Sequence, residues 1–416
     1  MDADVVVIGG GPSGMMAAGR AAEAGAKVIL LEKNPMLGKK LLITGGGRCN
    51  VTNAEPDIRT LLKRFRDADK FLFSPFSVFD NQKAIEFFNK KGVETKIENE
   101  GRVFPVSDSA QSIWDVLVRY MHTGKVEIRT ESPATRFVVE DGEVVSVELK
   151  NGTEIRANSF ILATGGMSRP ETGSTGDGFR MLKEIGHTVT EPSLSLVPVT
   201  IEDEWVKALS GVTLPDVKIR VFQDAMKHSE SRGKLLLTHF GVSGPTILNM
   251  SKDISELLSY GEVELSLDLL PGEDFSTLNT KLQELFKKED KKMFKNALPS
   301  LIPSALAPVI VGLSGINADK QCNSVTREER IALMKLLKDV RVKVTGLLGA
   351  DKAIVSSGGV ALTEIDWRTM RSKLFSNLYV VGDVLDINRP TGGYSLQLSW
   401  TTGYIAGSSA AHAQDQ

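Results

Sequence analysis

Cysteine and net charge are scarce in this chain of 416 residues, and each shortage argues against a class of protein. The two cysteines, Cys49 and Cys322, lie far apart and form no CxxC motif, so neither a disulfide scaffold nor a zinc site is expected. Charge is nearly balanced, with 50 Lys and Arg against 52 Asp and Glu, so no overall field recruits nucleic acid. The lysine-rich stretch from Lys287 to Lys295 is interrupted by two acids and is interpreted as a solvated helix face.

Long hydrophobic runs are missing as well. The apolar stretch Ala305 to Leu313 is too short to span a bilayer, and Pro308 breaks it. No charged-then-apolar leader precedes Val5. We therefore expect a cytoplasmic protein that acts on a small-molecule substrate and has neither a membrane nor a nucleic-acid partner, with its oligomeric state left open. The length predicts two or three domains.

A glycine-rich turn near the N-terminus carries the strongest positive signal. Four apolar residues, Val5 to Ile8, lead into Gly9-Gly10-Gly11-Pro12-Ser13-Gly14, and an alanine-rich segment follows. A strand, a GxGxxG turn and a helix in this order are typical of a dinucleotide-binding half, in which the helix N-terminus faces a pyrophosphate. The cofactor contacts predicted here are Gly9, Gly11, Pro12, Ser13 and Gly14.

An acidic residue follows the second predicted strand at the spacing that this motif requires. The strand Lys27 to Leu31 ends in Glu32, eighteen residues beyond Gly14. A carboxylate at this place binds the ribose hydroxyls of an adenosine and disfavours a 2′-phosphate. FAD or NAD is therefore favoured over NADP here, and Glu32 and Lys33 are predicted contacts.

Three consecutive glycines mark a second candidate region, Thr44-Gly45-Gly46-Gly47-Arg48-Cys49-Asn50. Because consecutive glycines lose much backbone entropy on folding, a close approach to a flat ligand explains them better than a flexible linker does. We predict that this loop covers one side of the ligand ring, with contacts from Thr44, Gly45, Gly46, Gly47, Arg48 and Asn50. Cys49 has no CxxC partner and no neighbouring histidine, so a reactive thiol is the less favoured interpretation.

The segments that follow predict an α/β fold. Residues 57 to 123 have mainly helical periodicity with one extended piece at 101–106, and residues 126–129 are expected to form a third parallel strand. A β-meander is predicted over 135–140, 144–150 and 153–156, because Asp-Gly and Asn-Gly turns separate the strands.

A buried strand, residues 159–162, then ends in Ala163-Thr164-Gly165-Gly166. This order of elements resembles FAD-dependent enzymes built like glutathione reductase, in which the end of that strand is a second backbone contact to the cofactor. The resemblance makes Ala163, Thr164, Gly165 and Gly166 candidate FAD contacts. The segment Thr175 to Gly178 is similar to one in fumarate-reductase-like flavoproteins.

Composition changes near Glu191. Residues 191–350 alternate short strands with helices. The strands are predicted at 196–201, 217–222, 235–238, 263–267 and 340–344, and the helices begin at Ser243, Ser276 and Arg327. We predict an inserted domain with a small β-barrel and a helical subdomain at about residues 270–335. The FAD-binding domain is then split into residues 1–190 and 351–416. No second GxGxxG occurs, so the fingerprint of a separate NAD(P)H domain is absent from the sequence.

The C-terminal segment supplies the last predicted contacts. A strand beginning at Leu378 ends in Gly382-Asp383, which in flavoproteins of this type holds the ribityl chain or the pyrophosphate. A final helix follows and runs to about Ala411; its first N–H groups are expected to face the flavin ring, where negative charge develops on reduction. The contacts predicted are Asp383, Gly393, Tyr394, Ser395 and Leu396.

Six stretches together resemble one family, the bacterial flavoproteins of the BaiN and YhiN type, which include aminoacetone oxidase. They are Ile43 to Asn53, Gly101 to Pro105, Leu237 to Pro245, Gly358 to Val360, Thr369 to Lys373 and Gly382 to Leu396. The resemblance implies noncovalently bound FAD and a Rossmann-like FAD domain split by a barrel and a helical insert. The chain departs from the family at Asp383, where Glu is more usual, and at Ser395, where Asn is common.

The resemblance also implies a FAD-dependent oxidoreductase, with hydride passing through flavin N5 between NAD(P)H, as a transient donor, or a small amine or ketone-type substrate and an acceptor. Arg48 is predicted to act electrostatically near the ring. His239 is the acid–base candidate, although a core or capping histidine is the favoured interpretation of it. Two alternatives stay open: a FAD-dependent RNA-modifying enzyme, against which the balanced charge counts, and a flavin redox sensor without turnover.

Overall fold

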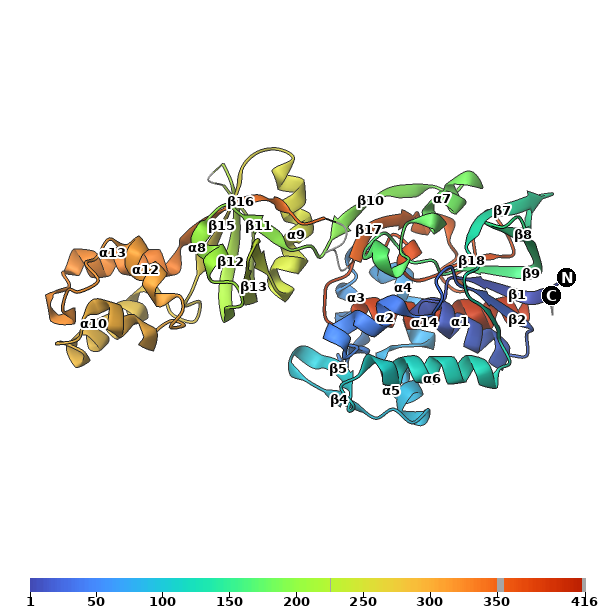
Figure 1. Ribbon diagram of the computed structural model, residues 1–416, viewed down its shortest axis with the longest axis horizontal. Coiled ribbons are helices and arrows are strands. Elements are labelled where there is room, and N and C mark those ends of the chain that lie inside the picture. The colour runs from blue at the N-terminus through green and yellow to red at the C-terminus, as the bar shows by residue number, and fades with distance from the viewer. Residues whose placement is uncertain (225, 350–354, 414–416) are drawn as a thin grey trace. The chain divides into compact units, whose positions relative to one another are not determined.

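The computed structural model describes residues 1–224, 226–349 and 355–413. The chain forms two compact units, one made of Met1–Leu194 and Ala353–Gln416 and the other of Ser195–Lys352 (Figure 1). Each unit has its own hydrophobic core. The predicted domain boundary at 350/351 lies outside the described residues.

A seven-stranded sheet forms the centre of the first unit. β1 (Ala3–Ile8) lies between β2 (Val28–Leu31) and β9 (Glu154–Leu162) and is parallel to both. β6 (Glu127–Arg129) pairs with β2, and β18 (Leu378–Val380) pairs with β9, again in parallel. β1, β2, β18 and the end of β9 are apolar runs, because a parallel strand covered on both faces is hydrophobic along its length, whereas the edge strand β6 is Glu-Ile-Arg and partly exposed.

The meander joins this sheet through one long strand. β7 (Ala134–Glu140) and β8 (Glu143–Leu149) are antiparallel, and β8 pairs with the first half of β9. The prediction of two separate strands, 153–156 and 159–162, was wrong. The chain stays extended between them because Ala157 pairs with Ala3 of β1, so β9 is antiparallel to β8 at one end and parallel to β1 at the other.

Helices cover the sheet of the first unit. They are α1 (Pro12–Glu23), α2 (Lys39–Ile43), α3 (Ile58–Lys63), α4 (Asp69–Val78), α5 (Asn81–Lys90), α6 (Ala110–Thr123), α7 (Asp177–Glu184) and α14 (Tyr394–His412). The mainly helical interpretation of residues 57–123 is thus confirmed. Two further small sheets are present: β3 (Thr52–Asn53), β5 (Arg102–Pro105) and β4 (Thr95–Ile97), and the pair β10 (Val189–Ser195) and β17 (Val355–Val360). β5 confirms the extended piece predicted at 101–106, but its pairing into a sheet was not predicted.

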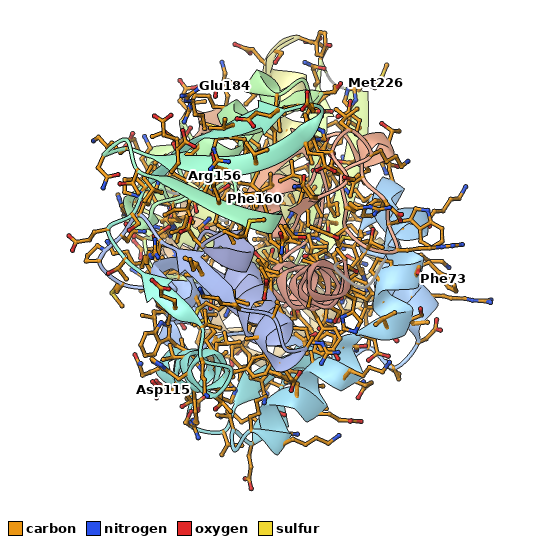
Figure 2. The ribbon with its side chains drawn as sticks, turned by 90° about the vertical axis from the view of Figure 1, so that its right-hand side faces the viewer. Phe73, Asp115, Arg156, Phe160, Glu184 and Met226 are labelled. Atoms are coloured by element: carbon orange, nitrogen blue, oxygen red, sulfur yellow. The ribbon has the colours of Figure 1, made fainter. Side chains whose placement is uncertain are left out.

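The last helix, α14, runs through the middle of the first unit. Figure 2 shows it in red, seen nearly along its axis, beside the blue N-terminal helices. It packs directly on α1, because a methyl group on Gly403 or Gly407 would come within 2.4 Å of a carbonyl oxygen of α1, that of Ser13 or Ala17. The side chain of Trp400 is fully buried and donates from Nε1 to the carbonyl of Val51 at 2.9 Å.

The second unit contains a closed six-stranded barrel. Its strands, in order around the barrel, are β11 (Val199–Ile201), β14 (Gly241–Ser243), β13 (Met226–Thr238), β12 (Thr213–Gln223), β15 (Val263–Asp268) and β16 (Val340–Leu347). Two helices accompany it, α8 (Glu204–Ala208) and α9 (Pro245–Leu258). The first half of β13 was missed because its sequence is polar, but it pairs with β12 as far as Gln223.

Four helices lie between β15 and β16 and gather at one end of the second unit (Figure 1). They are α10 (Phe275–Lys288), α11 (Phe294–Ala297), α12 (Ala307–Ser314) and α13 (Arg327–Lys338). α12 was not predicted; Pro308 stands in its first turn, where a missing N–H is tolerated. No helix in the described ranges is both long and apolar enough to cross a bilayer.

We expect the α1–α14 contact to tolerate no added side chain. Gly407→Ala should lower the free energy of unfolding by about 1–3 kcal/mol, because the new methyl group meets the Ala17 carbonyl. Gly312→Ala is the matched control: Gly312 lies in α12, has no neighbouring atom within 4 Å at that position, and should gain up to about 1 kcal/mol from helix propensity. Urea unfolding of both variants tests this; equal responses would contradict the packing argument.

Candidate functional site

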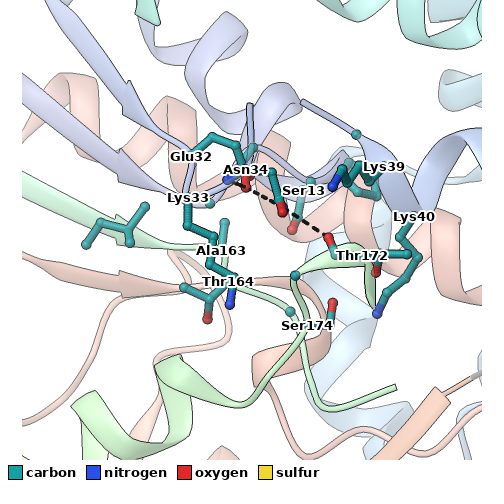
Figure 3. A pocket seen from close by; sticks show the side chains of 18 of the residues that line it. Ser13, Glu32, Lys33, Asn34, Lys39, Lys40, Ala163, Thr164, Thr172 and Ser174 are labelled. Atoms are coloured by element: carbon teal, nitrogen blue, oxygen red, sulfur yellow. Dashed lines mark hydrogen bonds between the residues drawn. The ribbon is translucent and has the colours of Figure 1, made fainter. Parts of the chain in front are cut away.

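A pocket opens in the first unit where β1, β2 and β9 end (Figure 3). It encloses about 820 Å³ of empty space, part of it open to solvent. Ligands bind at the carboxyl ends of strands in open α/β sheets, so the place is the expected one. Ten of the predicted contacts line it: Gly9, Gly11, Pro12, Ser13, Glu32, Lys33, Ala163, Thr164, Gly165 and Asp383.

The three glycines of the GxGxxG motif have different structural roles. A methyl group on Gly9 would come within 2.5 Å of the Ala163 carbonyl oxygen, and one on Gly14 within 1.9 Å of the Gly9 carbonyl oxygen. Both positions therefore permit close packing of α1 on the strands, and Gly14 does not line the pocket. At Gly11 no atom lies within 4 Å of the missing methyl group, so this position opens onto the pocket.

The first turn of α1 has free backbone donors. Its N-cap is Gly11, which offers no side-chain cap. Some helices are capped by a side chain, for example α3 by Asp57, α5 by Asp80 and α13 by Thr326, whereas α1 is among those that are not. An uncapped helix N-terminus that opens on a pocket is suited to an anion, because the unpaired N–H groups and the helix dipole both favour negative charge.

Glu32 is held rigidly at the edge of the pocket. Its Oε2 accepts from the Gly10 amide at 2.8 Å, and its Oε1 accepts from both the backbone N–H and the side-chain amide of Asn34 at 2.7 Å. The residue is buried. A carboxylate has about four acceptor sites, so these three bonds orient the group and leave it able to accept another.

Two further parts of the pocket wall carry charge. Lys33 binds Asp177 with 2.6 Å between Nζ and Oδ2. Burial alone would raise the pKa of Asp177, but the bonds from Lys33 and Thr175 hold that pKa below its usual value. Lys40 donates to Ser168 Oγ at 3.2 Å. Burial lowers the pKa of the Lys40 ammonium, and Asp383 acts in the opposite direction.

Several lining residues were missed from the sequence: Gly10, Asn34, Gly38, Lys39, Lys40, Ser132, Ala134, Thr172, Gly173, Ser174, Asp177 and Ser399. Asp177 lies in the segment noted as similar to fumarate reductases, which was a usable signal. Lys39 and Lys40 open the short helix before the triple glycine, and no spacing rule marks them. In Figure 3 Lys40 lies on the opposite side of Ser13 from Glu32.

The other predicted contacts form a second group in the same unit. Gly45, Gly46 and Gly47 all have left-handed backbone angles, and the last two have no atom within 4 Å where a side chain would begin. This loop leads into β3, which contacts the start of α14: a methyl group on Gly393 would come within 2.4 Å of the Thr52 carbonyl. The structure thus brings together the triple-glycine segment and the turn at Gly393, which are more than 300 residues apart in the chain.

Arg389 links the two groups. Its buried guanidinium forms an ion pair with Asp383, which lines the pocket, and donates from Nε to Ser395 Oγ at 3.1 Å in the first turn of α14. A third bond from Nη1 reaches the Ile387 carbonyl at 2.6 Å. Asp383 and Ser395 are the two positions at which the chain departs from the usual Glu and Asn, so both departures contact one side chain.

The two predicted catalytic residues lie outside the pocket lining. Arg48 binds Glu98 and, at 2.6 Å, Asp108, and its guanidinium stacks 4.1 Å from the centre of the Phe104 ring. His239 belongs to the second unit, where it is exposed in the turn between β13 and β14 with its ring against Phe240. Gly166 is buried directly behind Gly165.

Two predicted contacts contain buried oxygen atoms without a hydrogen-bond partner. Among the described side chains, Asn50 Oδ1 and Thr164 Oγ1 belong to the few buried polar atoms left unpaired. Buried polar groups are normally paired, so such atoms indicate a missing partner. Thr164 lines the pocket, and with the open face of Gly11 and the uncapped α1 it fits a phosphate-bearing, hydrogen-bonding cofactor at this site, whereas Asn50 lies outside the lining.

Comparison with known proteins identifies the family. A model of the HI0933-like protein Rossmann domain matches residues 3–409. The chain belongs to this family of FAD-dependent oxidoreductases. The predicted family and the predicted Rossmann-type FAD-binding fold with an inserted barrel are confirmed.

Two relatives of the HI0933-like family align over almost their whole length. The ribosomal RNA dihydrouridine synthase of Escherichia coli (strain K12) is 32% identical over 404 residues, covering 96% of each chain. The 3-dehydro-bile acid delta(4,6)-reductase of Clostridium scindens is 30% identical over 409 residues, covering 97% of this chain and 98% of its own. Among solved structures, 3-ketosteroid delta1-dehydrogenase from Sterolibacterium denitrificans has a TM-score of 0.57 at 13% identity, covering 99% of each chain, which shows the shared fold.

The buried thiols should be unreactive in the folded protein. Cys49 is fully buried, and burial raises its pKa to about 12; burial also raises the pKa of Cys322. At pH 8 both thiols therefore stay protonated and shielded, whereas the thiolate is the nucleophile. We expect a disulfide reagent such as DTNB to modify neither cysteine in native protein and both after unfolding in guanidinium. Rapid labelling of native Cys49 would contradict this.

Proposed function

We propose that this chain binds FAD noncovalently along the first unit. The adenosine ribose is held by Glu32, and the pyrophosphate by the α1 amides next to Gly11, with Lys40 as the nearby cation. The triple-glycine loop and the start of α14 face the flavin. The observation that carries this assignment is the uncapped N-terminus of α1, which opens through Gly11 on a pocket whose wall also bears Asp383, itself held by Arg389.

We propose further that the reaction is the reduction of a carbon–carbon double bond conjugated to a carbonyl group. Bound FAD in its reduced form supplies the hydride from N5. The substrate accepts that hydride at the carbon β to the carbonyl and a proton at the α carbon. The two full-length relatives described above support this chemistry, since a uracil base and a Δ4,6-unsaturated 3-keto steroid share the conjugated double bond.

Ribosomal RNA is the substrate class that we favour, with a uracil base as the acceptor. The relative named for it is the one with the higher identity of the two. This departs from the expectation of no nucleic-acid partner, which rested on the charge of the whole chain. A small unsaturated ketone is the second candidate, because the steroid reductase aligns over the same length.

NAD(P)H is proposed as a transient electron donor. The sequence has no second dinucleotide motif, so a donor that binds in passing over the flavin fits better than one with a dedicated domain. We keep Arg48 of the first unit as an electrostatic candidate, and His239, which is exposed in the second unit rather than part of a core, as an acid–base candidate.

Cofactor binding is tested by a pair of glycine variants. Gly11→Ala adds a methyl group that meets only pocket space, at a backbone angle of −78° that alanine adopts readily. We expect unchanged thermal stability of the apoprotein and FAD affinity reduced by roughly tenfold or more, about 1.4 kcal/mol per tenfold. Gly14→Ala instead meets the Gly9 carbonyl and should lower stability by about 1–3 kcal/mol. Weakened FAD binding with unchanged stability in both would contradict the assigned roles.

The reaction is tested with FAD-loaded protein under anaerobic conditions. NADH and NADPH are each added to find which donor bleaches the flavin band, and the reduced protein is then mixed with unmodified ribosomal RNA or with a 4,6-unsaturated 3-keto steroid. We expect reoxidation by RNA together with a mass gain of two hydrogens on one uridine after nuclease digestion. Reoxidation by the steroid alone would select the second candidate, and reoxidation by neither would contradict the proposed chemistry.

A further inference from the structure

The balanced charge of the whole chain conceals an uneven distribution. The helical subdomain, residues 275–338 with α10 to α13, carries eleven Lys and Arg against six Asp and Glu. The rest of the chain carries thirty-nine against forty-six. The helical subdomain is therefore cationic while the remainder is anionic, which the total of −2 does not reveal.

The positive charge gathers where α10 ends. Lys287, Lys288 and Lys291 are exposed, and within the described parts of the chain none of them has a carboxylate within ion-pair distance. Their neighbours differ: Lys292 pairs with Glu289, and Lys295 pairs with Asp319 at 2.6 Å. We call the three uncompensated residues the lysine surface.

The backbone around the lysine surface is ordered by its own contacts. Phe286, Phe294 and Ala297 are buried in the core of the second unit. The segment after α10 lies against residues 318–323, with the Phe294 amide donating to the Lys320 carbonyl at 2.8 Å and the Cys322 amide to the Lys292 carbonyl at 2.9 Å. The three lysines are thus presented from a fixed backbone, which reduces the ordering entropy that a partner must overcome.

We propose that the lysine surface of the helical subdomain binds the phosphate backbone of the RNA substrate. This rests on the proposed function, since it takes ribosomal RNA as the substrate, and it adds where that RNA is held. Polyanion binding is driven by Lys and Arg side chains that displace the counterions condensed on the phosphates. Three uncompensated ammonium groups can displace such counterions and so contribute to the binding free energy.

The anionic remainder of the chain supports the same assignment. A polyanion is repelled by the rest of the molecule and attracted by the helical subdomain, so the field directs RNA to one end of the second unit. Lysines in the last turn of a helix also interact favourably with the helix dipole. That interaction does not explain Lys291, because Lys291 lies beyond the last turn of α10.

The test compares two triple variants with the same change in net charge. One replaces the lysine surface (Lys287→Gln, Lys288→Gln, Lys291→Gln). The control replaces Lys63, Lys70 and Lys150 of the first unit by Gln; these are exposed, and within the described residues they form no ion pair. Binding of protein-free ribosomal RNA to the FAD-loaded proteins is measured by filter retention between 50 and 300 mM KCl.

We expect the lysine-surface variant to bind RNA roughly tenfold or more weakly at 100 mM KCl and to lose about two units of the slope of log K against log salt, since each phosphate contact contributes about 0.7–0.9. The control should change less than about twofold. FAD affinity and flavin reduction by NAD(P)H should stay as in the unmodified protein for both variants.

Four outcomes would overturn the assignment. Equal losses in the two variants would show an effect of net charge alone, and unchanged binding in the lysine-surface variant would place the RNA elsewhere. Binding of vesicles containing phosphatidylglycerol, lost in the lysine-surface variant while RNA binding is kept, would make the surface a membrane contact. If the unmodified protein reduces the steroid and neither binds nor reduces RNA, both the proposed substrate and the proposed binding surface are wrong. If RNA is reduced and the lysine-surface variant binds it unchanged, only the proposed binding surface is wrong.

Discussion

The close approach of α1 to its surroundings is the contact on which the rest of the structure depends. Gly9 and Gly14 let the start of this helix lie against the end of β9, and Gly403 and Gly407 let α14 pack on its other side. Each of these contacts places a backbone carbonyl where a side chain would otherwise stand. Because no side chain intervenes, the uncapped N–H groups of α1 lie at the floor of the pocket rather than behind a layer of side chains.

Charge in the pocket is arranged to leave positive potential for a phosphate. Asp383 and Asp177 each bind a cation, Arg389 and Lys33, so their negative charges are neutralised within the wall. Lys40 donates to the Ser168 hydroxyl instead. Carboxylates next to a pyrophosphate would repel it, and their pairing removes that repulsion while fixing their oxygen atoms for hydrogen bonds with hydroxyl groups.

The ion pair between Arg389 and Asp383 also connects segments that are distant in the sequence. Arg389 connects the pocket to the first turn of α14 through Asp383 and Ser395, and β3 connects the triple-glycine loop to Gly393. Asp for Glu and Ser for Asn each shorten a side chain, which is compatible with a guanidinium lying between them. The two departures from the family pattern therefore belong to one hydrogen-bonded group around the Arg389 guanidinium.

The sequence by itself determined the fold class and the adenosine half of the site. Glycines at fixed spacing and a carboxylate after the second strand are local signals, because the turn, the helix start and the strand end are all set by neighbouring residues. Prediction from the sequence was wrong where pairing with a neighbouring strand decides the conformation. β9 continues through 157–158 because β1 pairs with it, and the polar half of β13 is extended because it pairs with β12.

Only the tertiary structure decided which charges are neutralised. Lys40 carries no motif, and the contacts of Lys40 and Asp177 are with Ser168 and Lys33, which lie 128 and 144 residues away in the chain. The lysine-rich stretch was visible in the sequence, but only the structure shows that Lys292 and Lys295 have acidic partners while, among the described residues, the three lysines of the lysine surface have none. Ion pairs form only between groups within about 4 Å of each other, so they are set by folded distances that composition and spacing do not contain.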